Sequence, residues 1–295
     1  MRIAYSLFFI LGLALLTACQ STGAEPERTQ NQQQFIDKMV NQHGFERAAL
    51  EKTFSQVIRQ PKIIATMNKP AEAKPWYEYR TLFLAPERVQ AGANFWQANQ
   101  KTLEEAEHTY GVPAHIIIGI LGVETYYGRI TGNHRVMDVL TTLAFDYPKR
   151  GTFFRAELEE FLLLSREQAW NPLIIRGSYA GAMGKPQFMP SSYRRYAVGW
   201  RNEKRPIDLM TNDNDIIMSI ANYLHQKGWK PKQAIASTAP IPKGKLIELQ
   251  GVDKMESWQS FHNFNVIMKY NPRINYAMAV YQLGEKVRII RQQDL

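Results

Sequence analysis

An acidic residue, Glu124, lies in an otherwise apolar segment that is expected to be helical, residues 113–127. Three aliphatic residues precede it at helical spacing: Ile117, Ile120 and Leu121. The carboxyl group is therefore expected on the apolar face of the helix, where desolvation disfavours its charged form and favours an acid that can donate a proton near neutral pH. The alternative is that Glu124, close to the helix end, points into solvent or pairs with Arg129 or Arg150.

A second segment rich in polar chemistry is Gly177–Tyr193 (GSYAGAMGKPQFMPSSY), which holds three glycines and two prolines and cannot be one plain helix. Glycine permits close approach of the backbone to a ligand, while Ser178, Tyr179 and Gln187 supply hydroxyl, aromatic and amide groups. This inventory is suited to holding a sugar. The alternative is a tight corner between helices with a surface cluster of serine and tyrosine.

Several common sites are excluded by the sequence. No histidine pair has the spacing of a zinc protease, and the serine of Gly177–Gly181 stands second where a nucleophile elbow needs it third. Glycine-rich nucleotide loops are also missing, so we expect no cofactor. The single cysteine, Cys19, excludes an intramolecular disulfide and a site with several cysteine ligands. The net charge of +9 suits an acidic partner, whether nucleic acid, anionic lipid or the carboxylate-bearing cell wall.

Four segments follow one another along the chain: Gly122–Gly128 (GVETYYG), Gly177–Tyr193, Ala221–Tyr223 (ANY) and Lys269–Gly284 (KYNPRINYAMAVYQLG). In this order they resemble the motifs of the membrane-bound lytic murein transglycosylase B family, glycoside hydrolase family 103. The resemblance extends from about Phe35 to the C-terminus. It implies a lysozyme-like helical core and peptidoglycan strands, rather than nucleic acid, as the partner.

The resemblance also implies the reaction. Members of that family cleave the MurNAc-β-1,4-GlcNAc bond without water and leave a 1,6-anhydro end. The only catalytic carboxyl group of that family matches Glu124 in this sequence. One carboxyl group is sufficient when the nucleophile is a hydroxyl of the substrate itself, because an intramolecular attack has a very high effective molarity. Glu124 is then expected to act first as general acid and afterwards as general base.

Further site residues are implied by the same motifs. Ser178 and Gln187 match positions that hold the sugar and its N-acetyl group, and Lys149 with Arg150 matches a basic pair for the carboxylates of the stem peptides. The groove residues implied by the resemblance are Tyr79, Tyr223, Tyr270, Asn271 and Tyr276. The alternative for each tyrosine is ordinary packing.

One departure from the family concerns metal. Some members carry an EF-hand-like calcium loop after the Gln-Phe-Met-Pro segment, but residues 199–215 read GWRNEKRPIDLMTNDND. From Asp208 the third position is Met210, and no window that begins with aspartate has glycine sixth. We therefore expect no metal site here, and we expect Asp213 and Asp215 to cap the following helix.

Two other functions remain open from the sequence. A wall-binding module would use the same groove without turnover. A hydrolytic muramidase would need a second carboxyl group, for which Asp138, Asp146 and Glu157 are the candidates.

The elements that must position these residues are mainly helices. Helical spacing predicts two short helices in 34–64, a helix over 86–110, the helix of Glu124, and helices near 153–168, 190–198, 215–227 and 274–291. Prolines, glycines and an alternating stretch predict a small hairpin or sheet in 230–264. We expect a helical region over 35–75, a catalytic core over 76–229, this insertion, and a return to the core over 265–295.

The N-terminus is typical of a bacterial lipoprotein. Residues 7–16 (LFFILGLALL) form a short apolar core of signal-peptide length, although an uncleaved membrane anchor is an alternative. Leu16-Thr17-Ala18-Cys19 resembles a lipobox, which implies removal of residues 1–18 and lipidation of Cys19. Gln20 favours sorting to the outer membrane, with the protein on its periplasmic side. Residues 19–34 are expected to be a flexible tether, and the protein is expected to be a monomer.

Overall fold

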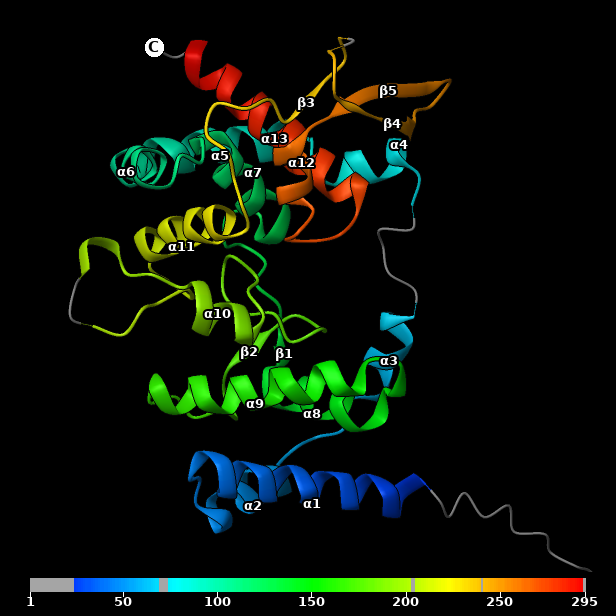
Figure 1. Ribbon diagram of the computed structural model, residues 1–295, viewed down its shortest axis with the longest axis vertical. Helices are drawn as coiled ribbons and strands as arrows, with labels where there is room; N and C mark the ends of the chain where they lie inside the picture. The colour runs from blue at the N-terminus through cyan, green and yellow to red at the C-terminus, as the bar shows by residue number, and fades with distance from the viewer. Residues whose placement is uncertain (1–23, 69–73, 203–204, 240, 294–295) are drawn as a thin grey trace, which may run out of the picture.

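The computed structural model describes residues 24–68, 74–202, 205–239 and 241–293. In Figure 1 its helices form tiers, from the N-terminal pair at the bottom to the C-terminal helix at the top. A small sheet lies at one upper corner. The prediction of a mainly α fold with a small β insertion is confirmed.

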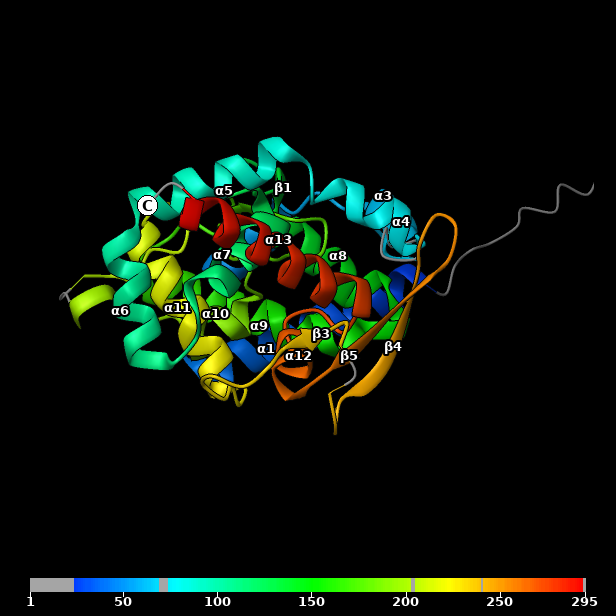
Figure 2. The same cartoon turned by 90° about the horizontal axis from the view of Figure 1, so that it is seen from above.

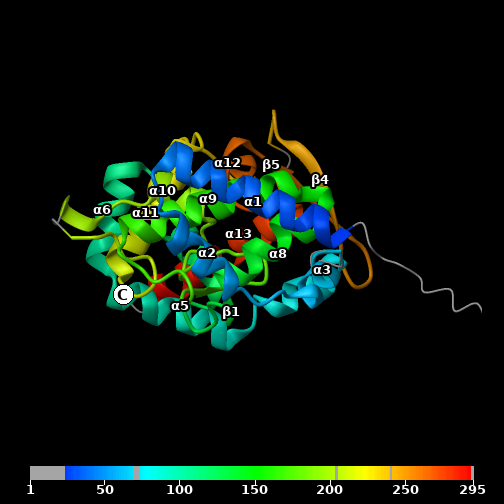
Figure 3. The ribbon, with the colours of Figure 1, turned by 90° about the horizontal axis from the view of Figure 1, so that it is seen from below.

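Three N-terminal helices run along the lowest tier and up to the next: α1 (Ala24–His43), α2 (Arg47–Ser55) and α3 (Pro61–Met67). The prediction of a flexible tether up to residue 34 is wrong for residues 24–34, which form the first half of α1. Phe35, Ile36 and Met39 bury the second half of this helix, and Arg28 in the first half pairs with Asp146 at 3.0 Å. Figure 3 shows α1 lying across the tier above it.

The predicted helix over 86–110 is divided into α5 (Pro86–Ala98) and α6 (Gln100–Tyr110). The break is at Asn99, whose backbone leaves the helical region (φ −118°, ψ 20°) and whose side-chain amide donates to the carbonyl of Phe95 at 3.0 Å. Asparagine competes with the helix for backbone groups in this way. Before α5 lie the short α4 (Trp76–Tyr79) and the 3₁₀ turn η2 (Arg80–Leu82).

The central helix α7 (Ala114–Thr125) carries Glu124 and packs against the long C-terminal helix α13 (Ile274–Gln293). Figure 2 shows α13 crossing over α7. Two glycines allow this close approach: a Cβ on Gly119 would lie 2.2 Å from the Val280 carbonyl oxygen, and one on Gly284 would lie 2.3 Å from that of His115. Any larger residue would push the two helices apart.

A second helix pair, α8 (Val136–Asp146) and α9 (Gly151–Glu167), forms the tier above α1, with the 3₁₀ turn η3 (Pro148–Arg150) between them. Helix α8 was not predicted from the sequence. Every residue from Val136 to Ala144 is buried, so the helix has no polar stripe from which its period can be recognised.

The glycine-rich segment, Gly177–Tyr193, lies between the tier of α8 and α9 and the helices above that tier. It starts in β2 (Arg176–Gly177), which pairs antiparallel with β1 (His134–Arg135), and it folds back on itself through bridges between Gly177 and Met183 and between Met183 and Phe188. It ends at α10 (Pro190–Tyr196), which is followed by η4 (Trp200–Asn202) and α11 (Asp213–Gln226).

The insertion forms a three-stranded antiparallel sheet in the order β3-β5-β4. Its strands are β3 (Ala236–Ser237), β4 (Lys245–Gln250) and β5 (Met255–Ser260), with Lys245 opposite Ser260. The alternating stretch that predicted a hairpin is β4, whose Ile247 and Leu249 face the core. Helix α12 (His262–Ile267) leads back to α13.

Within the described part of the chain, no helix has the length and apolar character needed to cross a bilayer. The signal peptide over 1–18 and the lipidation of Cys19 are predictions that lie outside the described residues.

Candidate active site

Glu124 lies half-buried in the last turn of α7 and lines a cleft of about 490 Å³. The cleft is formed by four elements: the end of α7, the η3 turn with the start of α9, the glycine-rich segment and the loop before α13. Six of the predicted site residues line it: Glu124, Arg150, Ser178, Gln187, Tyr270 and Asn271. The folding of the chain therefore brings the acid and most of the predicted sugar-binding groups to one place.

The backbone turns sharply directly after Glu124. Tyr126 and Tyr127 both have left-handed backbone conformations (φ 51° and 58°), and Tyr127 N–H donates to the carbonyl of Leu121 at 3.0 Å. The hydroxyl of Thr125 donates to the carbonyl of Lys185 at 2.8 Å. This bond ties the end of α7 to the glycine-rich segment beside Glu124.

Arg88 on α5 supports the same turn and was not predicted from the sequence as a site residue. Its guanidinium donates to the carbonyl of Gly122 at 2.6 Å and lies over the ring of Tyr126, 4.3 Å from the centroid. Burial lowers the pKa of Arg88, and the two neighbouring tyrosines oppose that shift. Arg88 and Gly122 are 34 positions apart, so no local pattern reveals the contact.

Tyr276, in the first turn of α13, contacts the acid directly. Its hydroxyl donates to Oε1 of Glu124 at 2.6 Å. The side chain is only 2% exposed and does not line the cleft, so it lies behind Glu124 rather than among the groove residues. Desolvation, together with the nearby charge of Glu124, raises the pKa of Tyr276 well above its usual value and keeps it a neutral donor.

The other predicted tyrosines differ in their positions. Tyr270 lines the cleft, stacks on Tyr276 with an interplanar angle of 16°, and donates from its hydroxyl to the carbonyl of Pro186 at 2.6 Å. Tyr223 is buried behind Tyr270 and donates to the carbonyl of Lys269 at 2.6 Å. Burial raises the pKa of both Tyr223 and Tyr270.

Tyr79 lies away from the cleft, buried against Trp76 and Phe83.

The glycine-rich segment presents two polar groups to the cleft. The Oγ of Ser178 accepts from the N–H groups of Ala180 and Ala182 at 3.3 and 3.1 Å, which leaves its own hydroxyl hydrogen for a ligand. Gln187 has a left-handed backbone (φ 52°) and donates both amide hydrogens, to the carbonyls of Thr131 and Gly184. Its carbonyl oxygen is therefore oriented by these two bonds and can accept from a ligand.

The predicted basic pair is separated. Arg150 lines the cleft, and its guanidinium lies 4.3 Å from the ring centroid of Phe153, an aromatic residue of the cleft that is 39% exposed. Lys149 is exposed outside the cleft, and its amine lies 3.4 Å from Oδ1 of Asn68. Phe153 was not singled out from the sequence, because its position at the cleft depends on how α9 begins.

The candidate second carboxyl groups lie elsewhere. Asp138 pairs with Arg135 at 2.6 Å, and Asp146 pairs with Arg28 and Arg59. Glu157 is buried and accepts from the backbone and the hydroxyl of Ser191, while desolvation raises its pKa. Among the described residues that line the cleft, Glu124 is the one carboxyl group.

The described residues also include no cluster of three or more histidine, cysteine, aspartate or glutamate side chains placed to hold a metal ion. Asp213 and Asp215 were expected to cap α11, but the cap is Asn212, whose Oδ1 accepts from the N–H groups of Asn214 and Asp215. Both aspartates lie in the first turn instead, and their side chains pair with Lys185 and Arg205.

Comparison with known proteins gives one consistent result. The family model described as the transglycosylase SLT domain matches residues 27–259 and 242–285. A curated relative, membrane-bound lytic murein transglycosylase B of Escherichia coli (strain K12), is 39% identical over 313 residues, which cover 92% of this chain and 86% of the relative.

Two solved structures are similar in fold. The Escherichia coli lytic transglycosylase SLT35 in complex with calcium has 38% sequence identity and a TM-score of 0.82, covering 88% of this chain and 93% of that one. SltB3 of Pseudomonas aeruginosa in complex with NAG-NAM-pentapeptide has 26% identity and a TM-score of 0.75, covering 90% of this chain and 80% of that one.

Proposed function

Because the chain belongs to the transglycosylase SLT domain family, it is a peptidoglycan lytic transglycosylase with a lysozyme-like helical core, and we propose that Glu124 alone carries its proton chemistry. The observation that carries this proposal is the position of Glu124 at the cleft, with Tyr276 bonded behind it and no second carboxyl group among the described lining residues. Ordinary glycosidases use two carboxyl groups that flank the bond, about 5–10 Å apart.

In the first step Glu124 donates its proton to the glycosidic oxygen as the bond from the MurNAc anomeric carbon breaks. The hydrogen bond from Tyr276 to Oε1 favours Oε2 as the oxygen that carries this proton. When the proton has left, the same hydrogen bond stabilises the resulting carboxylate.

In the second step the C6 hydroxyl of the same MurNAc attacks its anomeric carbon, and Glu124 accepts the hydroxyl proton as general base. A C1–O6 bond replaces the broken glycosidic bond, and the proton returns to Glu124. The products are a 1,6-anhydro-MurNAc end and a GlcNAc with a new 4-hydroxyl. Attack by a group of the substrate itself needs no activated water, and therefore no second carboxyl group.

Substrate binding is assigned to the other cleft residues. The oriented carbonyl of Gln187 and the hydroxyl of Ser178 are suited to the N-acetyl group and sugar hydroxyls, and the ring of Tyr270 with the amide of Asn271 is suited to a pyranose. Arg150 is suited to a stem-peptide carboxylate. The structure of SltB3 with NAG-NAM-pentapeptide supports a glycan bearing a peptide as the substrate class.

The deciding experiment is mass spectrometry of peptidoglycan digested with the wild-type protein and with Glu124→Gln. Anhydro-muropeptides from the wild type and none from the variant are expected. Reducing muropeptides would indicate a hydrolytic muramidase, and unchanged strands from both proteins would indicate a binding module. Full activity of Glu124→Gln would refute the single-acid assignment.

We also propose that a lipid on Cys19 holds the enzyme, as a monomer, at the periplasmic side of the outer membrane. The support is the lipobox-like sequence before Cys19 and the membrane-bound name of the Escherichia coli relative. Mass spectrometry of the mature N-terminus tests this, because lipidation adds acyl chains to Cys19 and Cys19→Ala would leave the protein in the soluble fraction.

A further inference from the structure

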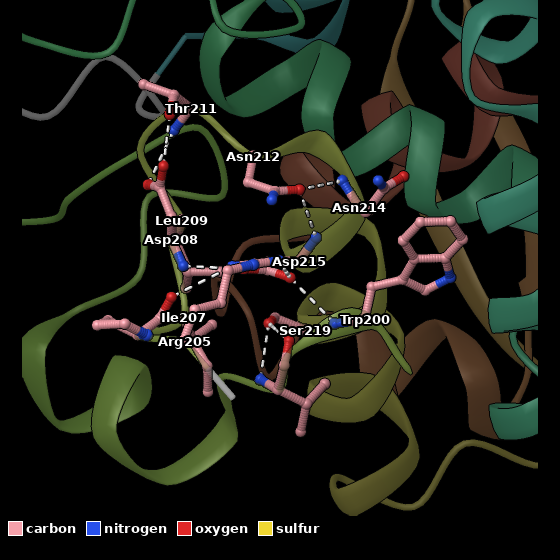
Figure 4. Close-up of polar contacts among 12 residues, drawn as sticks. Trp200, Arg205, Ile207, Asp208, Leu209, Thr211, Asn212, Asn214, Asp215 and Ser219 are labelled. Atoms are coloured by element: carbon pink, nitrogen blue, oxygen red, sulfur yellow. Dashed lines mark hydrogen bonds and ion pairs between the residues drawn. The ribbon is translucent and has the colours of Figure 1, made fainter. Parts of the chain in front are cut away.

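The described residues between α10 and α11, 197–202 and 205–212, are arranged around one buried carboxylate. Asp215, in the first turn of α11, is 0% exposed, and Figure 4 shows the surrounding chain directing its polar groups toward it. A buried charge of this kind is very unfavourable unless it is paired and hydrogen-bonded. Its partners therefore decide how the segment is held.

Four donors surround Asp215. Its Oδ1 accepts from the N–H of Trp200 at 3.0 Å and from Nη2 of Arg205 at 2.8 Å. Its Oδ2 accepts from the N–H of Asp208 at 2.9 Å and from Nη1 of Arg205 at 2.5 Å. An ionised carboxylate has about four lone-pair sites, so these four bonds saturate it.

The neighbouring aspartates are also engaged. Asp208 accepts through Oδ1 from the N–H groups of Met210 and Thr211 at 2.7 and 3.0 Å, and through Oδ2 from the hydroxyl of Thr211. Asp213 pairs with Lys185, its Oδ1 lying 2.5 Å from Nζ. Asp215 and Asp208 are thus filled by N–H and O–H donors, and the charge of Asp213 is balanced by Lys185 rather than by a hard cation.

The direction of the backbone also disfavours a cation. A calcium loop turns carbonyl and carboxylate oxygens toward the ion. Here the N–H groups of Trp200 and Asp208 point at the centre of the segment, and an N–H dipole repels a cation. SLT35, which shares 38% identity with this chain, has been solved in complex with calcium, but the described residues of this segment do not fit that ion.

We propose that Arg205 is the built-in counter-ion of this segment and does the structural work that a bound metal ion would do in a calcium loop. Its planar fork donates to both oxygens of Asp215, a bidentate geometry that a lysine ammonium does not match. Trp200, Arg205 and Asp208 are thereby tied to the first turn of α11 without a metal.

Lys185 links the residues around Asp215 to the active site. Its amine pairs with Asp213, its N–H donates to the carbonyl of Leu209 at 3.0 Å, and its carbonyl accepts from Thr125, the neighbour of Glu124. The residues around Asp215 therefore pack against the part of the glycine-rich segment that holds the end of α7. Divalent cations are expected to leave both stability and activity unchanged.

Thermal unfolding of the full chain tests the proposal. The wild-type melting temperature is expected to be the same in millimolar Ca²⁺ and in EDTA. Arg205→Met leaves the fully buried Asp215 without its counter-ion and is expected to lower the melting temperature by roughly 5–15 °C. Asp215→Asn leaves Arg205, whose side chain is 31% exposed, and should cost less. The double variant is expected to lose clearly less than the sum, because the Asp215 charge is then no longer buried alone.

Two further variants control for the loss of any arginine side chain. Arg201→Met removes an exposed arginine of the same segment, which stacks on Trp200, and should leave the melting temperature nearly unchanged. Arg205→Lys should recover only part of the loss. Three results would each overturn the proposal: stabilisation of the wild type by Ca²⁺, its destabilisation by EDTA, and additive effects of Arg205→Met and Asp215→Asn. The Ca²⁺ comparison remains decisive even if the variants fail to fold.

Discussion

The hydroxyl of Tyr276 lies 2.6 Å from Oε1 of Glu124 and joins α13 to α7 across 152 residues of sequence. Because Tyr276 is buried and its pKa is raised by desolvation, it stays neutral and donates to the carboxyl group throughout the reaction. The two oxygens of Glu124 are thereby made unequal. We interpret Tyr276 as a positioning residue rather than as a group that touches the glycan.

Replacing Tyr276 with phenylalanine is expected to lower kcat roughly 10- to 100-fold, because a hydrogen bond to a charged group contributes about 1.5–3 kcal/mol. KM should change little, since the side chain does not line the cleft. The bond favours the ionised carboxyl group, so its loss should extend activity to higher pH. Rates of anhydro-muropeptide release measured across a pH series check both effects.

Tyr281→Phe is the matched control, because Tyr281 is also on α13 and its hydroxyl donates to a backbone carbonyl, that of Ala236, at 3.1 Å. It should keep full kcat and the wild-type pH profile. An unchanged kcat in Tyr276→Phe, or a loss that only follows a lower melting temperature, would contradict the positioning role.

Arg88 is also expected to help position Glu124, through its hydrogen bond to the Gly122 carbonyl of α7. Arg88→Met removes the donor to the Gly122 carbonyl and the cation over Tyr126, so the strained turn after Glu124 should loosen. We expect kcat to fall about 10-fold or more with KM nearly unchanged, and the melting temperature to fall by several degrees. Steady-state kinetics and thermal unfolding of one preparation measure both.

Arg129→Met provides the comparison for Arg88, because Arg129 stacks on the same Tyr126 ring at 4.6 Å but is exposed. An equal loss in the two variants would mean that stacking alone supports the turn. It would leave the bond to Gly122 without a special role.

The sequence predicted the parts of the site that lie within its motifs, namely Glu124 on an apolar helix face and Ser178 and Gln187 in a glycine-rich segment. It did not show on which side of the acid each group lies. Tyr276 was predicted as a groove residue, yet it is buried behind Glu124. A motif gives the proximity of a residue, but exposure depends on how α7 and α13 cross.

The fold was predictable where amphipathic spacing was present and failed where burial removed it. Helix α8 is buried over nine consecutive residues and has no polar face, so its period is hidden. The first half of α1 is polar and was taken for a tether, because its helix is stabilised by distant contacts such as Arg28 with Asp146. Arg205 with Asp215 likewise depends on a turn that spacing alone does not reveal.

His115 gives a prediction for stability against pH. Its side chain is 14% exposed and lies beside Glu285 and Arg288. Desolvation lowers the pKa of His115 from 6.5 to about 4; the charge of Glu285 opposes this shift and that of Arg288 adds to it. Between these values the unfolded chain binds a proton that the folded chain does not, so stability falls as pH falls from about 6.5 toward about 4. We expect a loss on the order of 1–3 kcal/mol from this group.

Urea unfolding of the wild type and of His115→Gln at several pH values isolates this contribution, since carboxyl groups titrate in both proteins. The wild type should lose more stability than the variant over that window. His108→Gln, which removes an exposed histidine of α6, should follow the wild type. Parallel pH curves for the wild type and His115→Gln would show that the buried ring does not contribute.

The two neighbouring basic residues that the sequence grouped together are expected to differ in function. Arg150 lines the cleft beside Phe153, whereas Lys149 is exposed outside it. Arg150→Ala should raise KM roughly 3- to 10-fold for glycan strands that carry stem peptides, because it loses a charge-assisted bond to a carboxylate that solvent partly screens. It should leave KM unchanged for strands freed of peptide. Lys149→Ala should match the wild type on both substrates. If Arg150→Ala raised KM as much on peptide-free strands as on strands with peptides, Arg150 would contact the sugar and not the peptide.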